Sequence, residues 1–403
     1  MYKKYNKNFW ILFTGQSISN LGDQIYLITL PILVYELTKS SFIMGTVSAV
    51  NIIPELLFAL FIGAVVDRYK KKKIMLYTAI LEMIIMLSLS LLYSFNLLKM
   101  EMIYIFGFIF STLILVFLTT YRSTIPLLVS KEQIISVNSI IQISLTIIKI
   151  IGPGLAGFLI FQFNIAIALL LNSISFLVLS IFIYFTQIDE KHNFKSNKSI
   201  VEDITEGINE IKRNKSISYI TLLALFVNIG MSIGFSLLIF HLKDNFNFSE
   251  KSIGLIYSVS GIFAFIFSFA STYISNLCKN NILLITLSTL FAGLGLIIIS
   301  WAYNLLLISI ALGVITGGAT LATIYINSEL QLVTPPNLIG RVFATVQMIS
   351  RISLPISLIL GGWLSSFDSI GTSGTFFMCG LSIILLSVYG INKLRSFSND
   401  YTK

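Results

Sequence analysis

Apolar residues occur in long continuous stretches along the chain, separated by short polar breaks. A helix that spans the hydrocarbon core of a bilayer needs about 20 predominantly apolar residues. The stretches are continuous rather than alternating, which argues against a transmembrane β-barrel. The pattern therefore predicts an all-α integral membrane protein with twelve transmembrane helices, at residues 9–37, 41–66, 74–95, 101–127, 135–161, 163–186, 217–242, 252–276, 281–301, 303–331, 341–366 and 372–392.

The longest polar interval, residues 187–216, separates six predicted helices from six. We therefore expect an N-terminal six-helix half at 1–186 and a C-terminal six-helix half at 217–403, joined by this cytoplasmic linker. Ser199 and Glu202 fit a helix-capping box within the linker. Apolar residues then follow at helical spacing and predict a short amphipathic helix along the cytoplasmic surface: Val201, Ile204, Ile208 and Ile211. We favour an ordinary linker role for this helix over a regulatory one.

A weak internal repeat relates the two halves. Lys149 stands four residues before Pro153 in the fifth predicted helix, and Arg351 stands four residues before Pro355 in the eleventh. Such a match at equivalent helices favours the pseudo-symmetric duplication that some secondary transporters have. In proteins of that kind, the substrate site lies between the halves.

Charge composition fits a membrane location and predicts the orientation of the chain. The sequence is 56% hydrophobic and 11% charged, against about 45–50% and about 25% in ordinary soluble domains. Most of the 27 Lys and Arg residues fall on one side of the predicted helices if the N-terminus is cytoplasmic, as the positive-inside rule requires. We therefore expect a multi-pass protein of the cell membrane with both termini cytoplasmic. The net charge of +9 then needs no nucleic-acid partner, because a basic cytoplasmic face also attracts anionic lipid.

Several kinds of chemistry lack the residues they would need. The chain has two Cys and two His, which supports neither a disulfide framework nor a metal site. No G-x-x-x-x-G-K-[ST] motif occurs, so the chain carries no P-loop of its own. No catalytic constellation of Ser, His, Cys and acid stands out. We expect a protein that is not an enzyme, binds no cofactor, and draws its energy from an ion gradient, with protons the favoured ion.

The stretch "GAVVDRYKKKKIM" lies between the second and third predicted helices. It resembles the loop signature of the major facilitator superfamily, with Gly63, Asp67 and Arg68 at the matching positions. Lys70 stands where the common motif has a second glycine. The resemblance implies the major facilitator fold. Arg122, at the cytoplasmic end of the fourth helix, is expected either to pair with Asp67 as a gate or to remain a free surface residue.

Further stretches narrow the resemblance to one branch of that superfamily. "GQSISNLGDQIYLITLPILVYELTKSSFIMG", "YRSTIPLLVSKEQIISVNSI", "EDITEGINEIKRN" and "GRVFATVQMISRISLP" resemble the macrolide-efflux-like branch, which also includes siderophore exporters. "GPGLAG", with Gly152, Pro153 and Gly157, resembles a fifth-helix motif of antiporters, although Ile148 replaces its usual upstream glycine. The resemblance implies an exporter, and glycines beside a proline suit a closely packed, kinkable helix.

One acid stands near the middle of the first predicted helix. An ionised side chain at the bilayer centre costs about 2.5–3.5 kcal/mol on insertion scales, so it usually faces a cavity or a partner. Asp23 shares a helix face with polar neighbours, which suggests a water-lined wall: Gln16, Ser19, Asn20 and Tyr26. Asp23 is interpreted as a proton-titrating or cation-binding group. The alternative is a structural ion pair with Lys149 or Arg122.

Five other charges lie within predicted helices: Glu55, Glu82, Lys149, Glu329 and Arg351. Glu55 follows Pro54, and we expect it to reach the cavity. Packing or snorkelling is expected for Glu82 and Glu329, which stand nearer to helix ends. Lys149 and Arg351 are expected to pair with Asp23 and Glu55, with contact to an anionic group of the cargo as the alternative.

The sequence thus predicts a secondary active transporter that exports a bulky amphipathic small molecule, such as a macrolide-like drug, against proton entry. Its expected partners are the lipid bilayer, the small-molecule substrate and protons, and a monomer is expected. A siderophore exporter and a lipid flippase on the same fold are the alternatives of the same class. A membrane sensor or scaffold that does not transport is the alternative of another class.

Overall fold

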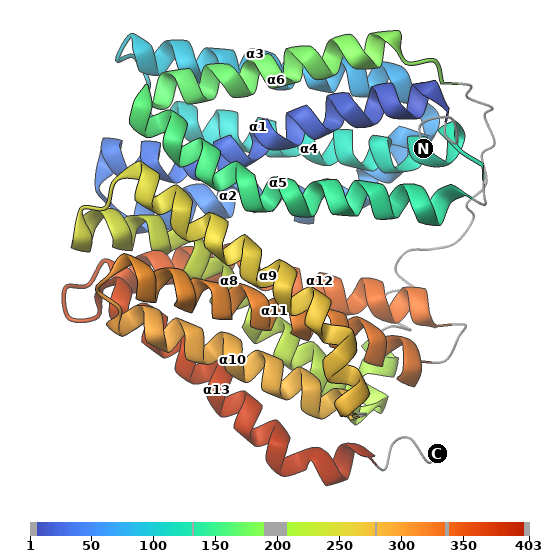
Figure 1. The fold of residues 1–403 in the computed structure, drawn as a ribbon, viewed down its shortest axis with the longest axis vertical. Helices are drawn as coiled ribbons and strands as arrows, with labels where there is room; N and C mark the ends of the chain where they lie inside the picture. The colour runs from blue at the N-terminus through green and yellow to red at the C-terminus, as the bar shows by residue number, and fades with distance from the viewer. Residues whose placement is uncertain (1–5, 131–132, 189–207, 279, 335–337, 399–403) are drawn as a thin grey trace. The chain divides into compact units, whose positions relative to one another are not determined.

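A computed structural model describes residues 6–130, 133–188, 208–278, 280–334 and 338–398 of the chain. These residues form twelve long helices and no strand. Figure 1 shows the course of the helices. The helices are α1 (Lys7–Thr38), α2 (Ser41–Arg68), α3 (Lys71–Ser94), α4 (Met100–Leu128), α5 (Ile134–Gln162), α6 (Ile165–Phe185), α8 (Lys215–Phe246), α9 (Glu250–Leu277), α10 (Asn281–Trp301), α11 (Leu305–Val333), α12 (Ile339–Ser365) and α13 (Gly371–Ser398).

The predicted all-helical membrane fold with twelve transmembrane helices is confirmed, and the helices begin and end close to the predicted positions. Within the described residues, eleven helices are long and apolar enough to cross a bilayer. The exception is α1, because the polar side chains between Gln16 and Gln24 lower its mean hydropathy. At the C-terminal end of the fold, α13 continues to Ser398, beyond the predicted end at residue 392.

Asparagine side chains cap several helices of the fold. A side-chain oxygen at the N-cap accepts a hydrogen bond from a backbone N–H that the helix itself leaves without a partner. Five helices begin in this way, at Asn6, Asn164, Asn214, Asn280 and Asn304. At the other ends, Lys39 after α1 and Asn247 after α8 adopt left-handed conformations with φ of 46° and 51°. Local sequence therefore sets many of the helix boundaries.

The chain divides into two compact units. Unit 1 consists of Met1–Lys39, Val50–Lys195 and Phe248–Ser258, and unit 2 of Ser40–Ala49, Ser196–Asn247 and Val259–Lys403. Each unit therefore contains six helices in the main, plus the first residues of one further helix. The beginning of α2 belongs to unit 2, and the beginning of α9 belongs to unit 1.

In unit 1, α6 packs against both α1 and α3, while α5 packs on α1 and α4 on α3. Two hydrogen bonds fix α6 against α3. Ser90 Oγ donates to the carbonyl of Ala166 at 2.7 Å, and Ser173 Oγ donates to the carbonyl of Met83 at 2.9 Å. Interhelical hydrogen bonds of this kind stabilise helix pairs in a membrane, where water offers no alternative partner. As a result, α6 is the helix that positions α1 and α3.

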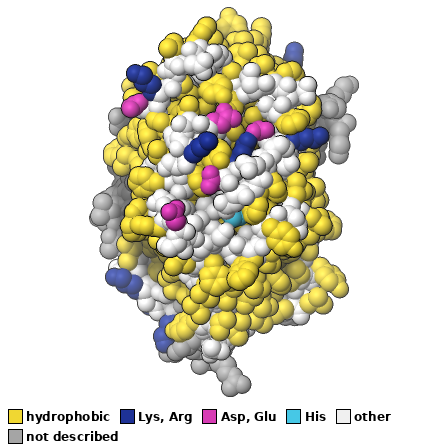
Figure 2. Space-filling model, turned by 90° about the vertical axis from the view of Figure 1, so that its left-hand side faces the viewer, with side chains coloured by type: hydrophobic (Ala, Val, Ile, Leu, Met, Phe, Trp, Pro, Cys, Tyr) yellow, Lys and Arg dark blue, Asp and Glu magenta, His cyan; other side chains and the backbone are white. Residues whose placement is uncertain are grey.

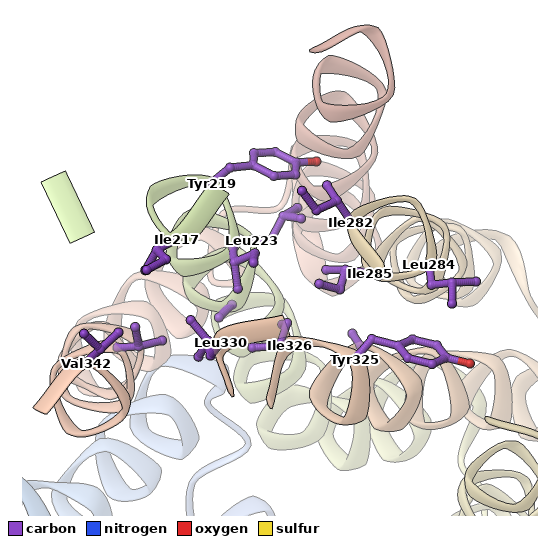
Figure 3. Close-up of a cluster of buried hydrophobic side chains, with 14 of the residues drawn as sticks. Ile217, Tyr219, Leu223, Ile282, Leu284, Ile285, Tyr325, Ile326, Leu330 and Val342 are labelled. Carbon is purple, nitrogen blue, oxygen red and sulfur yellow. The ribbon is translucent and has the colours of Figure 1, made fainter. Parts of the chain in front are cut away.

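In unit 2, α10 packs against α11 and α13, and α8 packs against α12 and α13. Figure 3 shows the buried cluster where side chains of α8, α10, α11 and α12 meet. The described residues 208–213 of the linker are helical, and Ile211 is buried in this cluster beside Ile217 and Tyr219. This end of the predicted amphipathic stripe therefore packs against protein. Val201 and Ile204 lie outside the described residues.

Each unit contains a close helix crossing at two glycines. In unit 1, a Cβ on Gly157 of α5 would lie 2.9 Å from the Cα of Gly254 on α9. In unit 2, a Cβ on Gly45 of α2 would lie 3.2 Å from the Cα of Gly362 on α12. Backbones approach this closely only where small residues face each other, as is common between transmembrane helices.

The outer surface carries many large apolar side chains. Phe269 is 82% exposed, Trp301 is 75% exposed and Phe61 is 70% exposed. In Figure 2, hydrophobic side chains cover much of the face in view, with small groups of charged side chains among them. Large exposed apolar areas mark a surface that another apolar phase covers. For membrane-spanning helices, that phase is lipid.

Candidate functional site

The predicted polar stripe of α1 is present and partly buried. Gln16 is buried, and its Nε2 donates a hydrogen bond to Asn20 Oδ1 at 2.9 Å. Asp23 lies near the middle of α1 and is partly exposed, but its Oδ1 is buried and has no hydrogen-bond partner among the described residues. The buried hydroxyl of Tyr26 likewise has no partner there. The stripe therefore presents polar groups that the protein itself does not satisfy.

The ion pair predicted for Asp23 is not formed. Lys149 on α5 and Arg122 on α4 are both exposed, and among the described residues neither makes an ion pair with Asp23. The prediction of this ion pair was wrong. It rested on the positions of the two cations along the sequence, whereas helix packing sets the directions of their side chains. Asp23 is held in the helix bundle without a compensating cation from the residues that the structure describes.

Asp23 follows a close contact between α1 and α6. A Cβ built on the preceding residue, Gly22, would overlap Asn172 Oδ1 and Ser175 Oγ of α6. Only a glycine leaves room for the Asn172 side chain at this position. Asn172 is fully buried, and its Nδ2 has no hydrogen-bond partner in the part of the chain that the structure describes. A second unsatisfied polar group therefore lies against the residue that precedes Asp23.

Sequence reasoning did not assign Glu82 of α3 to the candidate site. Of the two roles expected for it, packing fits and snorkelling does not, because Glu82 is 1% exposed and lies near the middle of α3 rather than near its end. Its Oε1 is buried without a hydrogen-bond partner among the described residues, and the charge of Asp23 acts on it. One signal was available in the sequence: Glu82 is the single acid of the predicted third helix.

Aromatic rings cover one side of this polar cluster. The ring of Tyr26 packs edge-on against Phe110 of α4 at a centroid distance of 4.8 Å, and Phe110 packs against Phe176 of α6 at 5.8 Å. Phe110 and Phe176 are buried. An apolar wall of this kind lowers the local dielectric and strengthens interactions between charges nearby.

The antiporter-like motif of α5 lies against the same part of α1. A Cβ on Gly152 would overlap the side chain of Gln24, which follows Asp23. Pro153 is buried within α5, and Gly157 makes the crossing with α9 described above. The motif thus lets two helices approach α5 closely, one of them beside Asp23.

For the other predicted residues, the structure gives the burial of the side chain or does not describe the side chain. Glu55 is partly buried in α2, directly after Pro54. Arg351 is exposed on α12 and belongs to unit 2. The structure does not describe the side chains of the predicted gate motif, Gly63, Asp67 and Arg68. The pairing of Asp67 with Arg122 therefore stays a prediction.

Glu329 of unit 2 has a packing role, as expected. It is fully buried in α11, and Asn281 Nδ2 at the start of α10 donates a hydrogen bond to its Oε2 at 2.9 Å. A buried carboxylate needs such donors. Glu329 therefore joins the ends of two packed helices.

Comparison with known proteins places this helix arrangement in a family. The sequence profile of the Major Facilitator Superfamily matches residues 12–358, which is most of the chain. The chain belongs to the Major Facilitator Superfamily. Macrolide efflux protein A of Streptococcus pyogenes is 24% identical to this superfamily member across 98% of each chain. The uncharacterized MFS-type transporter YfiS of Bacillus subtilis is also 24% identical, across 95% of this chain and 92% of its own.

Solved structures show the same superfamily fold. The nucleoside transporter NupG superposes with a TM-score of 0.75 at 13% identity, covering 96% of this chain and 98% of its own. A bacterial homologue of the iron transporter ferroportin gives a TM-score of 0.77 at 15% identity, covering 96% and 98%. The resemblance to the superfamily and to its macrolide-efflux-like branch is confirmed. The chain is a multi-pass membrane transporter rather than an enzyme.

Proposed function

We propose that the protein is a proton-coupled exporter of a bulky amphipathic small molecule of the macrolide class. It would act in the cell membrane as a monomer with both termini cytoplasmic. The full-length similarity to a macrolide efflux protein supports the substrate class and the export direction. The antiporter-like motif beside Asp23 supports exchange of substrate against an ion.

The observation that carries the proposal is the unpaired carboxyl of Asp23. An ionised Asp at the centre of a transmembrane helix costs about 2.5–3.5 kcal/mol on insertion scales. A structural role would offset this cost through an ion pair or hydrogen bonds, yet the buried Oδ1 has neither among the described residues. A proton bound to the carboxyl removes the charge. An acid in such a place is therefore suited to bind a proton and to release it in another conformation.

Transport would follow alternating access. With the site open to the outside, a proton binds the Asp23 carboxylate and the substrate leaves. The protonated carrier changes conformation because burying the neutral carboxyl away from water costs less free energy than burying the ionised one. With the site open to the cytoplasm, the proton passes to water and a new substrate molecule binds. Proton entry thus drives substrate export, and no nucleotide is needed.

Transport assays with an Asp23→Asn variant test the coupling. Wild-type protein in everted membrane vesicles of a host that lacks its own exporters is expected to accumulate a radiolabelled macrolide when a proton gradient is applied. Asn keeps the size and polarity of Asp but cannot bind and release a proton. Asp23→Asn should therefore lose gradient-driven accumulation while still exchanging labelled for unlabelled substrate. Asp368→Asn, which changes an exposed acid, is the matched control and should transport normally.

Two outcomes would contradict the proposal. If Asp23→Asn accumulates substrate as the wild type does, Asp23 does not couple transport to protons. If the wild type protects the host against a siderophore or moves a labelled lipid but leaves macrolides untouched, the substrate class is wrong. Susceptibility of the host to a panel of compounds, with and without the protein, separates these substrates.

A further inference from the structure

Asp23 and Glu82 lie at the same level of α6, although α1 and α3 are far apart in sequence. On one side of α6, Gly22 lies against Asn172 and Ser175. On the other side, the carbonyl of Met83 accepts the hydrogen bond from Ser173 Oγ at 2.9 Å. The residues that adjoin these two contacts are Asp23 and Glu82. Both acids therefore adjoin contacts with one turn of α6, residues 172–175.

A second contact on each side fixes this register. Gly15 of α1 lies against Phe182 of α6, two turns away from the contact at Gly22. Ser90 of α3 donates its hydrogen bond to Ala166 of α6, again about two turns from the contact at Met83. Since each helix pair is fixed at two points, neither acid reaches another level of α6 without breaking a packed contact.

No described cation compensates the two acids. Neither Asp23 nor Glu82 has an ion-pair partner within the described ranges. The α6 helix between them carries no Asp, Glu, Lys, Arg or His. On the other helices that pack against α1, Arg122 of α4 and Lys149 of α5 are exposed. The negative charges of the pair therefore act on each other without a nearby positive charge.

Asn172 is the polar group of α6 at this level. Ser175 Oγ donates to Asn172 Oδ1 at 3.2 Å, so the amide oxygen has a partner. The amide nitrogen, Nδ2, is buried and has none among the described residues. An N–H group forms a stronger hydrogen bond with an ionised carboxylate than with a protonated carboxyl group. Asn172 is therefore a donor at this level of α6 that the described residues leave unused.

We propose that Glu82 is the second acid of the coupling site, and that Asp23 and Glu82 together hold one exchangeable proton at this level of α6. This inference rests on the proposed function and names a further residue of the same site. Two carboxylates that share a low-dielectric space disfavour each other's ionisation, so one proton belongs to the pair rather than to either residue.

The step is a proton transfer and needs no other reactant. A proton from outside water forms an O–H bond with one carboxylate of the pair, while the other acid keeps its negative charge. After the conformational change, the O–H bond breaks, the proton passes to cytoplasmic water, and the electron pair stays on the carboxylate oxygen. Proton occupancy of the pair thus changes by one in each cycle.

Infrared titration of the purified protein tests this inference without any substrate. A protonated carboxyl has a C=O stretch that an ionised carboxylate lacks. Wild-type protein is expected to show such a band that persists as pD is raised. Asp23→Asn and Glu82→Gln should each make the remaining band disappear at lower pD, because the repulsion from the other acid is gone. Glu101→Gln, which changes an exposed acid at the start of α4, should leave the band unchanged.

Transport measurements separate this inference from the proposed function. In proteoliposomes, Glu82→Gln should lose proton-driven macrolide uptake and retain exchange of labelled for unlabelled macrolide, as Asp23→Asn does. Glu82→Asp, which restores a carboxyl, should recover part of the driven uptake. The double variant should be no worse than either single variant, because both acids serve one site.

Three results would overturn parts of the scheme. If Glu82→Gln keeps driven uptake and the wild-type titration while Asp23→Asn loses both, Glu82 is not part of the site. If the wild type responds to a sodium gradient but not to a proton gradient, the pair binds a metal cation instead. If the wild type shows the coupled titration but transports no macrolide, the proposed function fails and the proton-sharing pair stands.

Discussion

The approach of α1 to α6 at Gly22 supports the placement of both acids, and a stability measurement tests it. Gly22→Ala would add a Cβ that overlaps Asn172 Oδ1 and Ser175 Oγ and lies 3.0 Å from Ser175 Cβ. The Asn172 side chain can rotate away. Ser175 Cβ cannot, because it is fixed to the backbone of α6. Relief therefore requires the two helices to move apart, and overpacking of this kind costs about 1–3 kcal/mol.

Alanine also favours helix over glycine, which offsets up to about 1 kcal/mol of that cost. Gly234→Ala in α8 is the matched control, because its nearest atom is the end of the Leu296 side chain at 3.2 Å, which can move. Gly234→Ala should thus be neutral or stabilising by up to about 1 kcal/mol. The difference between the two variants is expected to be about 1–3 kcal/mol.

Unfolding by SDS in mixed micelles, followed by tryptophan fluorescence, measures both variants. Asn172→Ala removes the closest obstacle, so the double variant with Gly22→Ala should recover part of the lost stability, with an interaction energy of about 0.5–3 kcal/mol. Equal stabilities for Gly22→Ala and Gly234→Ala would refute the reasoning. In that case α1 would not approach α6 at Asn172, and the placement of Asp23 beside Glu82 would fail with it.

Two further predictions concern other helix contacts. Gly157→Ala places a Cβ against the backbone of α9 and should reduce both thermal stability and transport. In the control variant Gly154→Ala, the new Cβ meets the Ser258 side chain, whose hydroxyl lies 2.7 Å away and can move, so the effect should be mild. Equal effects of the two variants would contradict the close crossing. Asn281→Ala removes a hydrogen-bond donor from the buried Glu329 and should lower the free energy of unfolding by about 1.5–3 kcal/mol in the same SDS assay. A decrease below about 0.5 kcal/mol would show that other contacts suffice to stabilise Glu329.

The sequence by itself determined the helices and the family. Whether a stretch crosses a bilayer depends on the length and continuity of its apolar run, which are properties of the linear chain. The spans predicted from that pattern therefore match the observed helices within a few residues at most ends. The family followed from motifs that are also linear, such as Gly63 to Lys73 and "GPGLAG". Asp23 stood out because one charge in an apolar run is visible without a structure.

The tertiary structure decided which residues surround Asp23. Lys149 and Arg122 appeared to be partners from their positions in neighbouring predicted helices, but both side chains are exposed. Glu82 appeared to stand near a helix end, yet it is buried and adjoins the contact of Met83 with the same turn of α6 that Gly22 meets. The contacts between α1, α3 and α6 depend on the rotation of each helix about its axis and on where the helices cross. Those quantities are set by packing between distant segments, which the order of residues along one helix does not contain.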